Sequence, residues 1–449
     1  MAVIEASVAF SSLYVAGVIL FGSVELCEES LGSLALRAAV VALVVLVCLV
    51  AMGLYQFHQR LYFREAVVRL LVGVAASCVV LAVVFYAFPA LIVSRALAGI
   101  AVTYSLVLLL LVRYLFVRTV DENIFRHRTL VYGAGSRALS IFDLRRRADR
   151  RGFKVLGRVA APGDKVVDES KLLDIDGESI TEAAVRMDVD EIVVAMDDRR
   201  GNLPIRDLLN ARLRGIDVID LLEFLERETG KIRVDLVRPG WLIFSPGFRA
   251  GWLRRTTKRL MDLFVSAIGV TLGSPVMLLT ALAIKLEDGP SAPLFYRQTR
   301  VGQGGEHFEI LKFRSMTVDA EAEGEAVWAD ESDSRVTRVG KVLRKFRADE
   351  VPQVFNVLLG HMSIVGPRPE RPEFVEDLQK TIPYYSERHI VKPGITGWAQ
   401  VRYTYAASEE DALEKLQYEL YYIKNQSLML DIMIILQTVE VVLWSKGAR

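Results

Sequence analysis

The sequence is short of cysteine and of net charge, and each shortage excludes a class of function. Its three cysteines, Cys27, Cys48 and Cys78, lie in or beside apolar segments. They lack the spacing of a metal site or of a disulfide framework, which predicts small buried hydrophobic residues. The 55 basic and 54 acidic residues leave a net charge of +1. The overall charge therefore indicates no nucleic-acid partner, and only local patches could recognise a charged ligand.

We also expect no cleavable signal sequence. The N-terminus has no basic region, and its apolar run is long enough to stay in the bilayer. Apolar residues are abundant instead: they make up 52% of the 449 residues, and the mean hydropathy is +0.31. This composition predicts an integral membrane protein with soluble parts, and the length predicts two or three domains.

Four stretches without charge are long enough to cross a bilayer, which takes about 20 apolar residues in a helix. They lie at residues 6–24, 38–57, 70–94 and 96–112. We expect residues 1–118 to form a four-helix transmembrane domain. Acids and bases inside the membrane mark the pathway of a transporter, and these stretches have none. We therefore interpret the domain as an anchor that could also form a homodimer.

The loops between these stretches differ in charge. The first loop carries Glu25, Glu28 and Glu29, whereas the second carries Arg60 and Arg64. Four arginines follow the fourth stretch, between positions 113 and 128. Since basic loops tend to stay in the cytoplasm, we expect a cytoplasmic N-terminus, a cytoplasmic second loop and a cytoplasmic remainder of the chain.

Residues 119–250 show strands alternating with helices, a pattern typical of a parallel sheet in a Rossmann-like α/β domain. Gly133 and Gly135 follow the first strand and match part of a dinucleotide fingerprint, in which amides at a helix N-terminus face a pyrophosphate. The acid expected at the end of the second strand is missing, because two alanines follow that strand and Asp164 comes late. The domain could therefore bind a nucleotide, or it could be a scaffold or regulatory relic. We favour the second interpretation.

A fifth uncharged run covers residues 263–284 and is also long enough to span. Ser274 and Pro275 interrupt it, because proline removes a backbone donor and bends a helix. The serine hydroxyl could bond the carbonyl that the proline leaves free. Basic residues flank the run on both sides, which favours two cytoplasmic ends. We expect a re-entrant hairpin at about residues 258–286, and a kinked spanning helix stays the alternative.

Residues 251–449 carry the densest polar motifs, and we expect an α/β catalytic domain there. Asp349 and Glu350 follow a basic helical run, and Pro352 places both near a helix N-terminus, where proline is tolerated. Residues 295–316 are predicted to form two strands joined by a turn.

Three further segments of this domain have a recognisable pattern. Residues 321–333 form an acidic, loop-like stretch, and residues 413–423 and 428–444 form amphipathic helices. Asp431 and Glu440 interrupt the last helix, so we expect it to lie in the membrane interface rather than to cross the bilayer.

Adjacent acids close to several arginines indicate metal-assisted chemistry on phosphate. A carboxylate can attack phosphorus, provided that Mg²⁺ and arginines neutralise the phosphate charge. Arg344 precedes Asp349 by five residues and Arg368 follows it by nineteen, and each could clamp a phosphate. The alternative is structural: the acids could cap a helix, and the arginines could face solvent or lipid headgroups.

Five motifs, taken in order, resemble the bacterial sugar transferase family, the monotopic phosphoglycosyltransferases. They are Ser274-Pro275, Lys312-Phe-Arg-Ser-Met316, residues 343–358, Met362-Ser-Ile-Val-Gly-Pro-Arg-Pro369 and Lys392-Pro-Gly-Ile-Thr-Gly-Trp-Ala-Gln400. The resemblance covers about residues 254–447. The whole chain resembles the long form of the family, which adds four transmembrane helices and a Rossmann-like domain, and its C-terminal part is most similar to members that initiate exopolysaccharide synthesis.

The resemblance implies transfer of a sugar 1-phosphate from a nucleoside diphosphate sugar, most often a UDP-sugar, to undecaprenyl phosphate at the bacterial inner (cytoplasmic) membrane. Asp349 would attack the β-phosphate and form a covalent phosphosugar. Glu350 would either help Asp349 to bind Mg²⁺ or deprotonate the acceptor. Ser274 and Pro275 match the helix break that makes the hairpin. The residues implied to bind substrate phosphate are Lys312, Arg314, Arg344 and Arg368.

One segment departs from the family pattern, since Arg402-Tyr-Thr-Tyr405 stands where many members have an Asn-Gly-Arg type sequence. The identity of the sugar is therefore left open. The alternative function is a membrane scaffold or sensor whose middle domain binds a nucleotide, although the set of acids and arginines argues against it as the whole function. A transporter of the lipid product would need intramembrane polar residues, which the four stretches lack.

Overall fold

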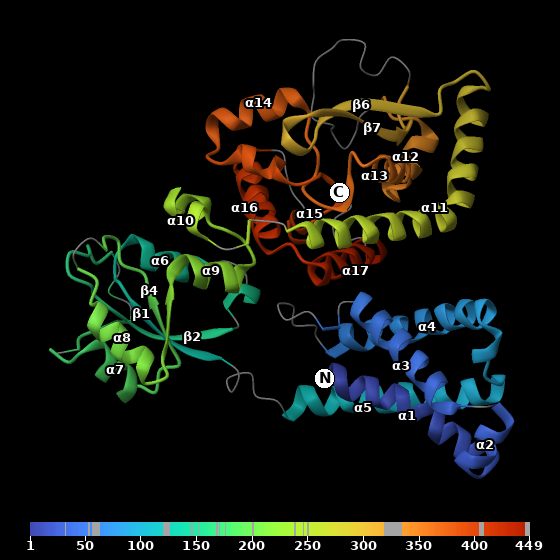
Figure 1. Cartoon of the computed structure of the whole chain (residues 1–449), viewed down its shortest axis with the longest axis horizontal. Coiled ribbons are helices and arrows are strands. Elements are labelled where there is room, and N and C mark those ends of the chain that lie inside the picture. The colour runs from blue at the N-terminus through green and yellow to red at the C-terminus, as the bar shows by residue number, and fades with distance from the viewer. Residues whose placement is uncertain are drawn as a thin grey trace. The chain divides into compact units, whose positions relative to one another are not determined.

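The structure is a computed structural model of the whole chain and divides into two units, Met1–His127 with Arg145–Lys154 and Arg128–Leu144 with Val155–Arg449, which are described separately (Figure 1). The predicted acidic stretch at 321–333 and part of the departing segment lie outside the described residues. The structure describes all residues except 32, 53, 56–62, 120–125, 145–146, 151, 168, 170, 176, 200–201, 238, 246, 249–250, 318–334, 404–407 and 445–449.

The described residues of the first unit include four helices that are long and apolar enough to cross a membrane. Helix α1 packs against α3 and α5, α3 packs against α4, and α4 packs against α5, while the short α2 (Val24–Leu31) follows α1. The apolar stretches of the sequence therefore fold as helices, as expected for a membrane protein. The four helices are α1 (Ala2–Phe21), α3 (Leu34–Ala51), α4 (Phe63–Ala87) and α5 (Arg95–Thr119).

Glu5 lies just before the first predicted apolar stretch, which begins at residue 6. Helix α1 begins at Ala2, so Glu5 lies within it and is almost fully buried. Glu5 Oε1 lies 2.6 Å from Arg113 Nε of α5, and the Tyr55 hydroxyl donates to Glu5 Oε2. A buried carboxylate is costly unless it is paired. Charge pairing near helix ends therefore accompanies the apolar packing of this unit.

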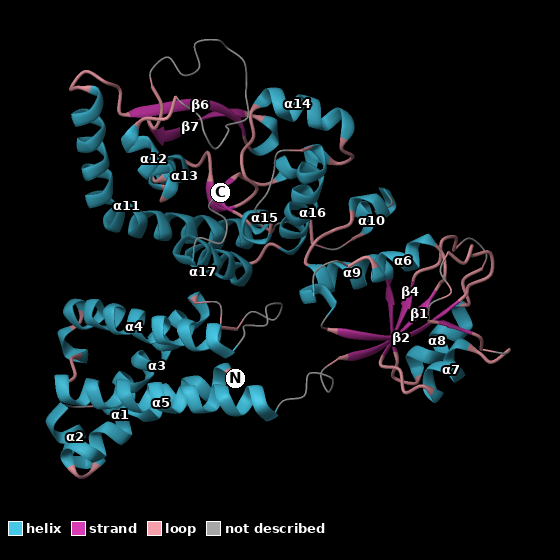
Figure 2. Ribbon diagram, turned by 180° about the vertical axis from the view of Figure 1, so that it is seen from behind, coloured by secondary structure: helices cyan, strands magenta, loops and turns pink. Residues whose placement is uncertain are grey.

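The middle part of the chain forms a five-stranded sheet in the order β3-β2-β1-β4-β5. Strand β4 runs parallel to β1 and to β5, and β3 runs parallel to β2. Helices α6 (Ser136–Phe142) and α9 (Leu221–Thr229) lie on one face, and α7 (Ile180–Arg186) and α8 (Ile205–Leu213) on the other (Figure 2). The predicted parallel α/β sheet is confirmed. Its strands are β1 (His127–Tyr132), β2 (Phe153–Val159), β3 (Leu172–Leu173), β4 (Glu191–Val194) and β5 (Asp217–Asp220).

The C-terminal region is built on a hairpin and a short parallel pair of strands. The strands β6 (Phe295–Val301) and β7 (His307–Phe313) form the antiparallel hairpin, which confirms the predicted strand–turn–strand. The strands β8 (Ser363–Val365) and β9 (Gly394–Thr396) pair in parallel. The helices of this region are α12 (Arg338–Lys345), α13 (Gln353–Leu359), α14 (Pro372–Thr381), α15 (Trp398–Arg402), α16 (Glu409–Asn425) and α17 (Leu428–Trp444).

Helix α11 (Trp252–Asp288) runs without interruption through Ser274 and Pro275, where a break is predicted, and consists of two arms that meet at a sharp bend (Figure 1). Pro275 lies inside it and has no N–H for the carbonyl of Thr271. The Ser274 hydroxyl donates to that carbonyl at 2.9 Å, as expected from the sequence. Large apolar side chains along both arms are exposed, among them Phe264 and Leu279. A bend in an apolar helix is thereby stabilised without an unpaired carbonyl.

Asp431, one of the two acids that interrupt the last helix, is buried against neighbouring helices. Its carboxylate is buried and lies 3.1 Å from Lys258 Nζ of α11, and the Tyr422 hydroxyl donates to it at 2.7 Å. The acid therefore joins α17 to α11 and α16. The interfacial placement of α17 stays a prediction.

The segment after α9 packs into the C-terminal core. Ile232 and Val234 are buried in the same cluster as Trp398 and Leu416. The indole Nε1 of Trp398 donates to the carbonyl of Gly230 at 2.7 Å. The predicted boundary between residues 250 and 251 stays a prediction, but the C-terminal core takes side chains from well before it.

Candidate active site

The two adjacent acids lie in a short 3-10 turn, η6 (Ala348–Glu350), between α12 and α13. Arg347 opens the turn with a φ of 55°, a left-handed conformation that is uncommon for a non-glycine residue. Pro352 caps α13 directly afterwards. The acids therefore stand just before the helix N-terminus, close to where the sequence places them.

The Glu350 side chain is only 12% exposed and lies among three cations. Its Oε1 lies 2.9 Å from Arg368 Nη2, 3.1 Å from Lys312 Nζ and 3.7 Å from Arg347 Nη1. Burial alone would raise the pKa of Glu350, but the charges of Arg368 and Lys312 hold that pKa far below its usual range. Glu350 is therefore ionised and already neutralised by its neighbours.

The pKa of Asp349 is shifted in the opposite direction to that of Glu350. Its side chain is buried, and its Oδ1 has no hydrogen-bond partner among the described residues. Burial, and after it the negative charge of Glu350, raise the pKa of Asp349 above its ordinary value. Two adjacent carboxylates with pKa shifts of opposite sign are typical of acids that have different tasks. Asp349 therefore holds a buried carboxylate oxygen that no described residue binds.

Two of the four predicted phosphate-binding residues meet at this site, and Arg347 joins them. Lys312 comes from β7, and Arg368 follows β8, so the fold brings together segments that are distant in sequence. Burial lowers the pKa of Lys312, and the charge of Glu350 raises the pKa of Arg368. Arg347 belongs to the predicted basic run, but no periodicity in the sequence distinguishes it from its basic neighbours.

The structure does not bring Arg314 or Arg344 to the carboxylates. Arg314 is buried, and its Nη2 donates to Asp288 at the end of α11 at 2.5 Å. Among the described residues, no hydrogen bond or ion pair joins the Arg344 side chain to Asp349 or Glu350. Their roles in binding phosphate stay predictions, and Arg314 has a structural role in holding the end of α11.

The loop that carries Arg368 is tightly held. The amide of Gly366 donates to Thr396 O at 2.9 Å, and the amide of Gly394 donates to Pro367 O at 2.8 Å. A Cβ at Gly366 would collide with the carbonyl of Lys392, so only glycine allows this close approach. The guanidinium of Arg368 therefore starts from a fixed backbone.

The acids could contribute to a metal site, although the described residues contain no group of three side chains that could hold an ion by themselves. Mg²⁺ commonly takes one or two carboxylates and completes its shell with water and substrate phosphates. The free Oδ1 of Asp349 is a suitable ligand of that kind. The residues present therefore fit a Mg²⁺ ion that is shared with a substrate phosphate.

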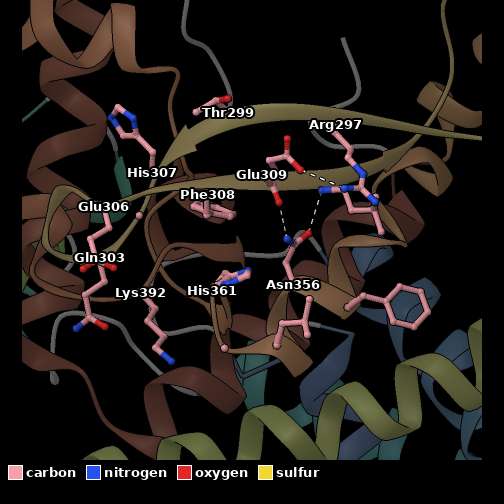
Figure 3. A pocket seen from close by; sticks show the side chains of 15 residues that line it. Arg297, Thr299, Gln303, Glu306, His307, Phe308, Glu309, Asn356, His361 and Lys392 are labelled. Carbon is pink, nitrogen blue, oxygen red and sulfur yellow. Dashed lines mark hydrogen bonds and ion pairs between the residues drawn. The ribbon is translucent and has the colours of Figure 1, made fainter.

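A cavity of about 960 Å³ lies elsewhere, on the other face of the hairpin (Figure 3). Arg297, Glu309 and Leu311 line it from β6 and β7, and Asn356 lines it from α13. Lys312 is the next residue along β7 and points to the opposite face, because side chains alternate along a strand. Asn356 also holds β7, since its Oδ1 accepts from Leu311 N at 2.9 Å. The cavity is therefore separate from the two carboxylates.

The amides near Gly133 and Gly135 are occupied by the protein's own acids. Asp197 accepts from the amides of Ser136 and Arg137 at 3.1 and 2.9 Å, and Asp164 accepts from the amide of Ala134 at 2.9 Å. A carboxylate is favoured at a helix N-terminus for the same reason as a phosphate. The late Asp164, which does not match the fingerprint, thus closes the loop. This geometry supports the scaffold interpretation over a nucleotide site.

The chain matches the family model described as bacterial sugar transferase over residues 253–445. It is 44% identical over 269 residues to the UDP-N-acetylgalactosamine-undecaprenyl-phosphate N-acetylgalactosaminephosphotransferase of Aeromonas hydrophila, a match that covers 59% of this chain and 61% of that protein. The chain thus spans less than two thirds of that relative's length.

Two further relatives match different lengths of the chain. A UDP-glucose:undecaprenyl-phosphate glucose-1-phosphate transferase of Caulobacter vibrioides is 41% identical over 193 residues, which are 42% of this chain and 71% of that protein. An uncharacterized sugar transferase of Haemophilus influenzae is 29% identical over 382 residues, which are 81% of this chain and 79% of that protein. The similarity therefore extends well beyond the region that carries the acids.

Asp197→Ala should destabilise the chain by about 1 kcal/mol, because the two amides at the start of α6 lose their acceptor. Thermal unfolding in detergent measures the change. Glu169→Ala removes an exposed carboxylate with no side-chain partner among the described residues and should leave the transition unchanged. Titration of the unaltered protein with a dinucleotide should give no binding signal, and micromolar binding would contradict the closed loop.

Proposed function

Because the chain belongs to the bacterial sugar transferase family, we propose that it transfers a sugar 1-phosphate from a nucleoside diphosphate sugar to undecaprenyl phosphate. Two named relatives, from Aeromonas and Caulobacter, carry this kind of reaction in their names, with different UDP-sugars. The observation that carries the proposal is the free, buried Oδ1 of Asp349 beside an ionised Glu350 that holds two cations.

The reaction takes two displacements at phosphorus. An oxygen of Asp349 attacks the β-phosphorus, forming an acyl phosphate, and the bond from that phosphorus to the bridging oxygen breaks to release a nucleoside monophosphate. A phosphate oxygen of undecaprenyl phosphate then attacks the same phosphorus and frees the carboxylate. Lys312 and Arg368 neutralise the charge that both steps gather at the phosphate. The product is an undecaprenyl diphosphate sugar, as in the first membrane step of exopolysaccharide synthesis.

Glu350 acts in this proposal as an organiser of charge. A general base works best when its pKa lies near the working pH, whereas cations hold the pKa of Glu350 far below that range. The carboxylate keeps Lys312 and Arg368 at the site and raises the pKa of its neighbour. Asp349 and Glu350 would also hold Mg²⁺, which supplies neutralisation of the diphosphate charge when bound.

The placement at the membrane rests on the two arms of α11. Arg259 and Asp262, on the first arm, bond to residues of α13 and β8, and Asp288, at the end of the second arm, bonds to Arg314. A straight helix of this length would extend about 55 Å and separate these contacts across a bilayer. Attachment of both arms to one domain supports a re-entrant hairpin with both ends on the cytoplasmic face.

The rest of the proposed setting follows from the first unit. Its four apolar helices would form a transmembrane bundle in the bacterial inner membrane, and a homodimer through this bundle or the middle domain is part of the proposal. A nucleotide-sensing scaffold is disfavoured as an alternative function, because Asp164 and Asp197 occupy the amides that a nucleotide would need.

Asp349→Asn should lower sugar-phosphate transfer by about 10⁴-fold, because the amide cannot form the acyl phosphate. Incubation with a nucleotide sugar labelled in the sugar, without undecaprenyl phosphate, should leave label on the unaltered protein and none on the variant. Asp377→Asn changes an exposed carboxylate of α14 and should retain both signals. Full activity of Asp349→Asn would exclude the mechanism.

Glu350→Gln and Lys312→Met should move the acidic limb of kcat/KM in opposite directions. Asp349 must be ionised to attack, and Glu350 raises its pKa while Lys312 lowers it. Removing the Glu350 charge therefore shifts the limb to lower pH, and removing the Lys312 charge shifts it to higher pH. The profile is measured from nucleoside monophosphate release. Shifts of the same sign in both variants would be incompatible with Asp349 as the titrating group.

Cysteines placed at Arg255, in the first turn of α11, and at Ser291, just after its second arm, should react with a membrane-impermeant thiol reagent from the same side. Both positions are exposed, and Cys78, the exposed native cysteine, is first replaced by serine. Sealed vesicles of known orientation show the side. Labelling of the two positions from opposite sides would establish the kinked spanning helix instead.

A further inference from the structure

A buried ion pair lies behind the loop that carries Arg368. Arg388, in the 3-10 segment η7 (Tyr385–Ile390), and Glu419, in α16, are each less than 5% exposed. Arg388 Nε donates to Glu419 Oε2 at 2.8 Å, and Arg388 Nη2 donates to Glu419 Oε1 at 2.7 Å. This two-point geometry fixes the plane of the guanidinium.

Arg388 also bonds to the loop that carries Arg368. Its Nη2 also donates to the carbonyl oxygen of Arg368 at 2.8 Å, and its Nη1 donates to the Tyr385 hydroxyl at 2.9 Å. The residue whose carbonyl is bound is the one whose guanidinium lies 2.9 Å from Glu350. The buried pair therefore contacts the catalytic loop at the backbone of its phosphate-binding residue.

We propose that Arg388, held by Glu419, is a positioning residue that fixes the backbone of Arg368 and so directs its guanidinium to Glu350 and the substrate phosphate. The inference rests on the proposed function, in which Arg368 neutralises phosphate charge. It assigns to Arg388 no contact with substrate.

The loop is anchored on both sides of Arg368 and at Arg368 itself. Backbone hydrogen bonds hold Gly366 and Pro367 on one side of Arg368, and Arg300 Nη1 donates to Pro369 O at 3.2 Å on the other. At Arg368 itself the carbonyl bonds to Arg388. The Arg368 side chain is long and 36% exposed, so its direction depends on the backbone from which it starts.

A purely stabilising role is the weaker account of the pair. Burying two charges costs solvation free energy that their attraction offsets only in good geometry, so a buried ion pair adds little net stability compared with apolar side chains. What such a pair provides is a fixed arrangement. A displacement of about 1 Å of a catalytic group can cost about 10²-fold in rate.

The test is a double-mutant cycle on the full-length protein, with Arg388→Lys, Arg368→Ala and the double variant. A lysine cannot keep both bonds to Glu419 and the bond to the Arg368 carbonyl. Arg388→Lys alone should lower kcat by about 10²-fold, with a smaller change in KM. In the Arg368→Ala background the same change should cost less than about twofold, because the guanidinium that it positions is gone.

The same fold-loss from Arg388→Lys in both backgrounds would overturn the inference, since a structural role does not depend on the Arg368 side chain. Full activity of Arg368→Ala would also overturn it. The proposed reaction would fall only if Asp349→Asn were active as well, so the two failures are distinguishable.

Two variants guard against misfolding as the cause. Tyr385→Phe removes one acceptor of Arg388 and leaves its bonds to Glu419 and Arg368, so it should give a smaller loss of kcat with the same dependence on Arg368. If Arg388→Lys does not fold, this second cycle decides the question by the same criterion. Arg227→Lys alters an ion pair with buried Glu191 in the middle domain and should lower thermal stability without changing kcat.

Discussion

The pairing of the largely buried Glu350 charge is the constraint on which the C-terminal region depends. A carboxylate inside a protein requires cations at short distance, because an unpaired buried charge is strongly destabilising. Lys312 and Arg368 supply them from β7 and from the loop after β8. The hairpin, the turn η6 and the parallel pair β8–β9 must therefore meet at one point. The need to pair the Glu350 charge therefore accounts both for the meeting of these segments and for the positive charge around the site.

The pairing of Glu350 with cations also determines the electrostatic surroundings of Asp349. Because the cations gather on Glu350, its neighbour Asp349 receives burial and a nearby negative charge, and both raise its pKa. Asp349 and Glu350 are both carboxylates, and only their surroundings shift their pKa values in opposite directions. The buried pair Arg388–Glu419 extends the arrangement one layer outward, through the Arg368 backbone. Charge at the centre and hydrogen bonds around it define a single rigid site.

Features that depend on local pattern could be predicted from the sequence: the apolar helices, the β6–β7 hairpin, and the bond from Ser274 to the carbonyl freed by Pro275. Features that depend on tertiary pairing could not. Arg113 meets Glu5 across 108 positions, and Asp197 reaches the Arg137 amide across 60. Arg314 looks like a phosphate ligand in its motif but bonds to Asp288, because the end of α11 happens to lie beside it.

The bond between Trp398 and Gly230 bears on how this protein can be divided. The indole N–H of Trp398 has its acceptor before residue 250, and Ile232 and Val234 fill part of the C-terminal core. A fragment that began at residue 251 would leave a buried donor without a partner and a gap among large side chains, both of which are destabilising. On these contacts we expect a stable catalytic fragment of this chain to begin at Gly230 or earlier, so that the segment after α9 belongs structurally to the C-terminal core.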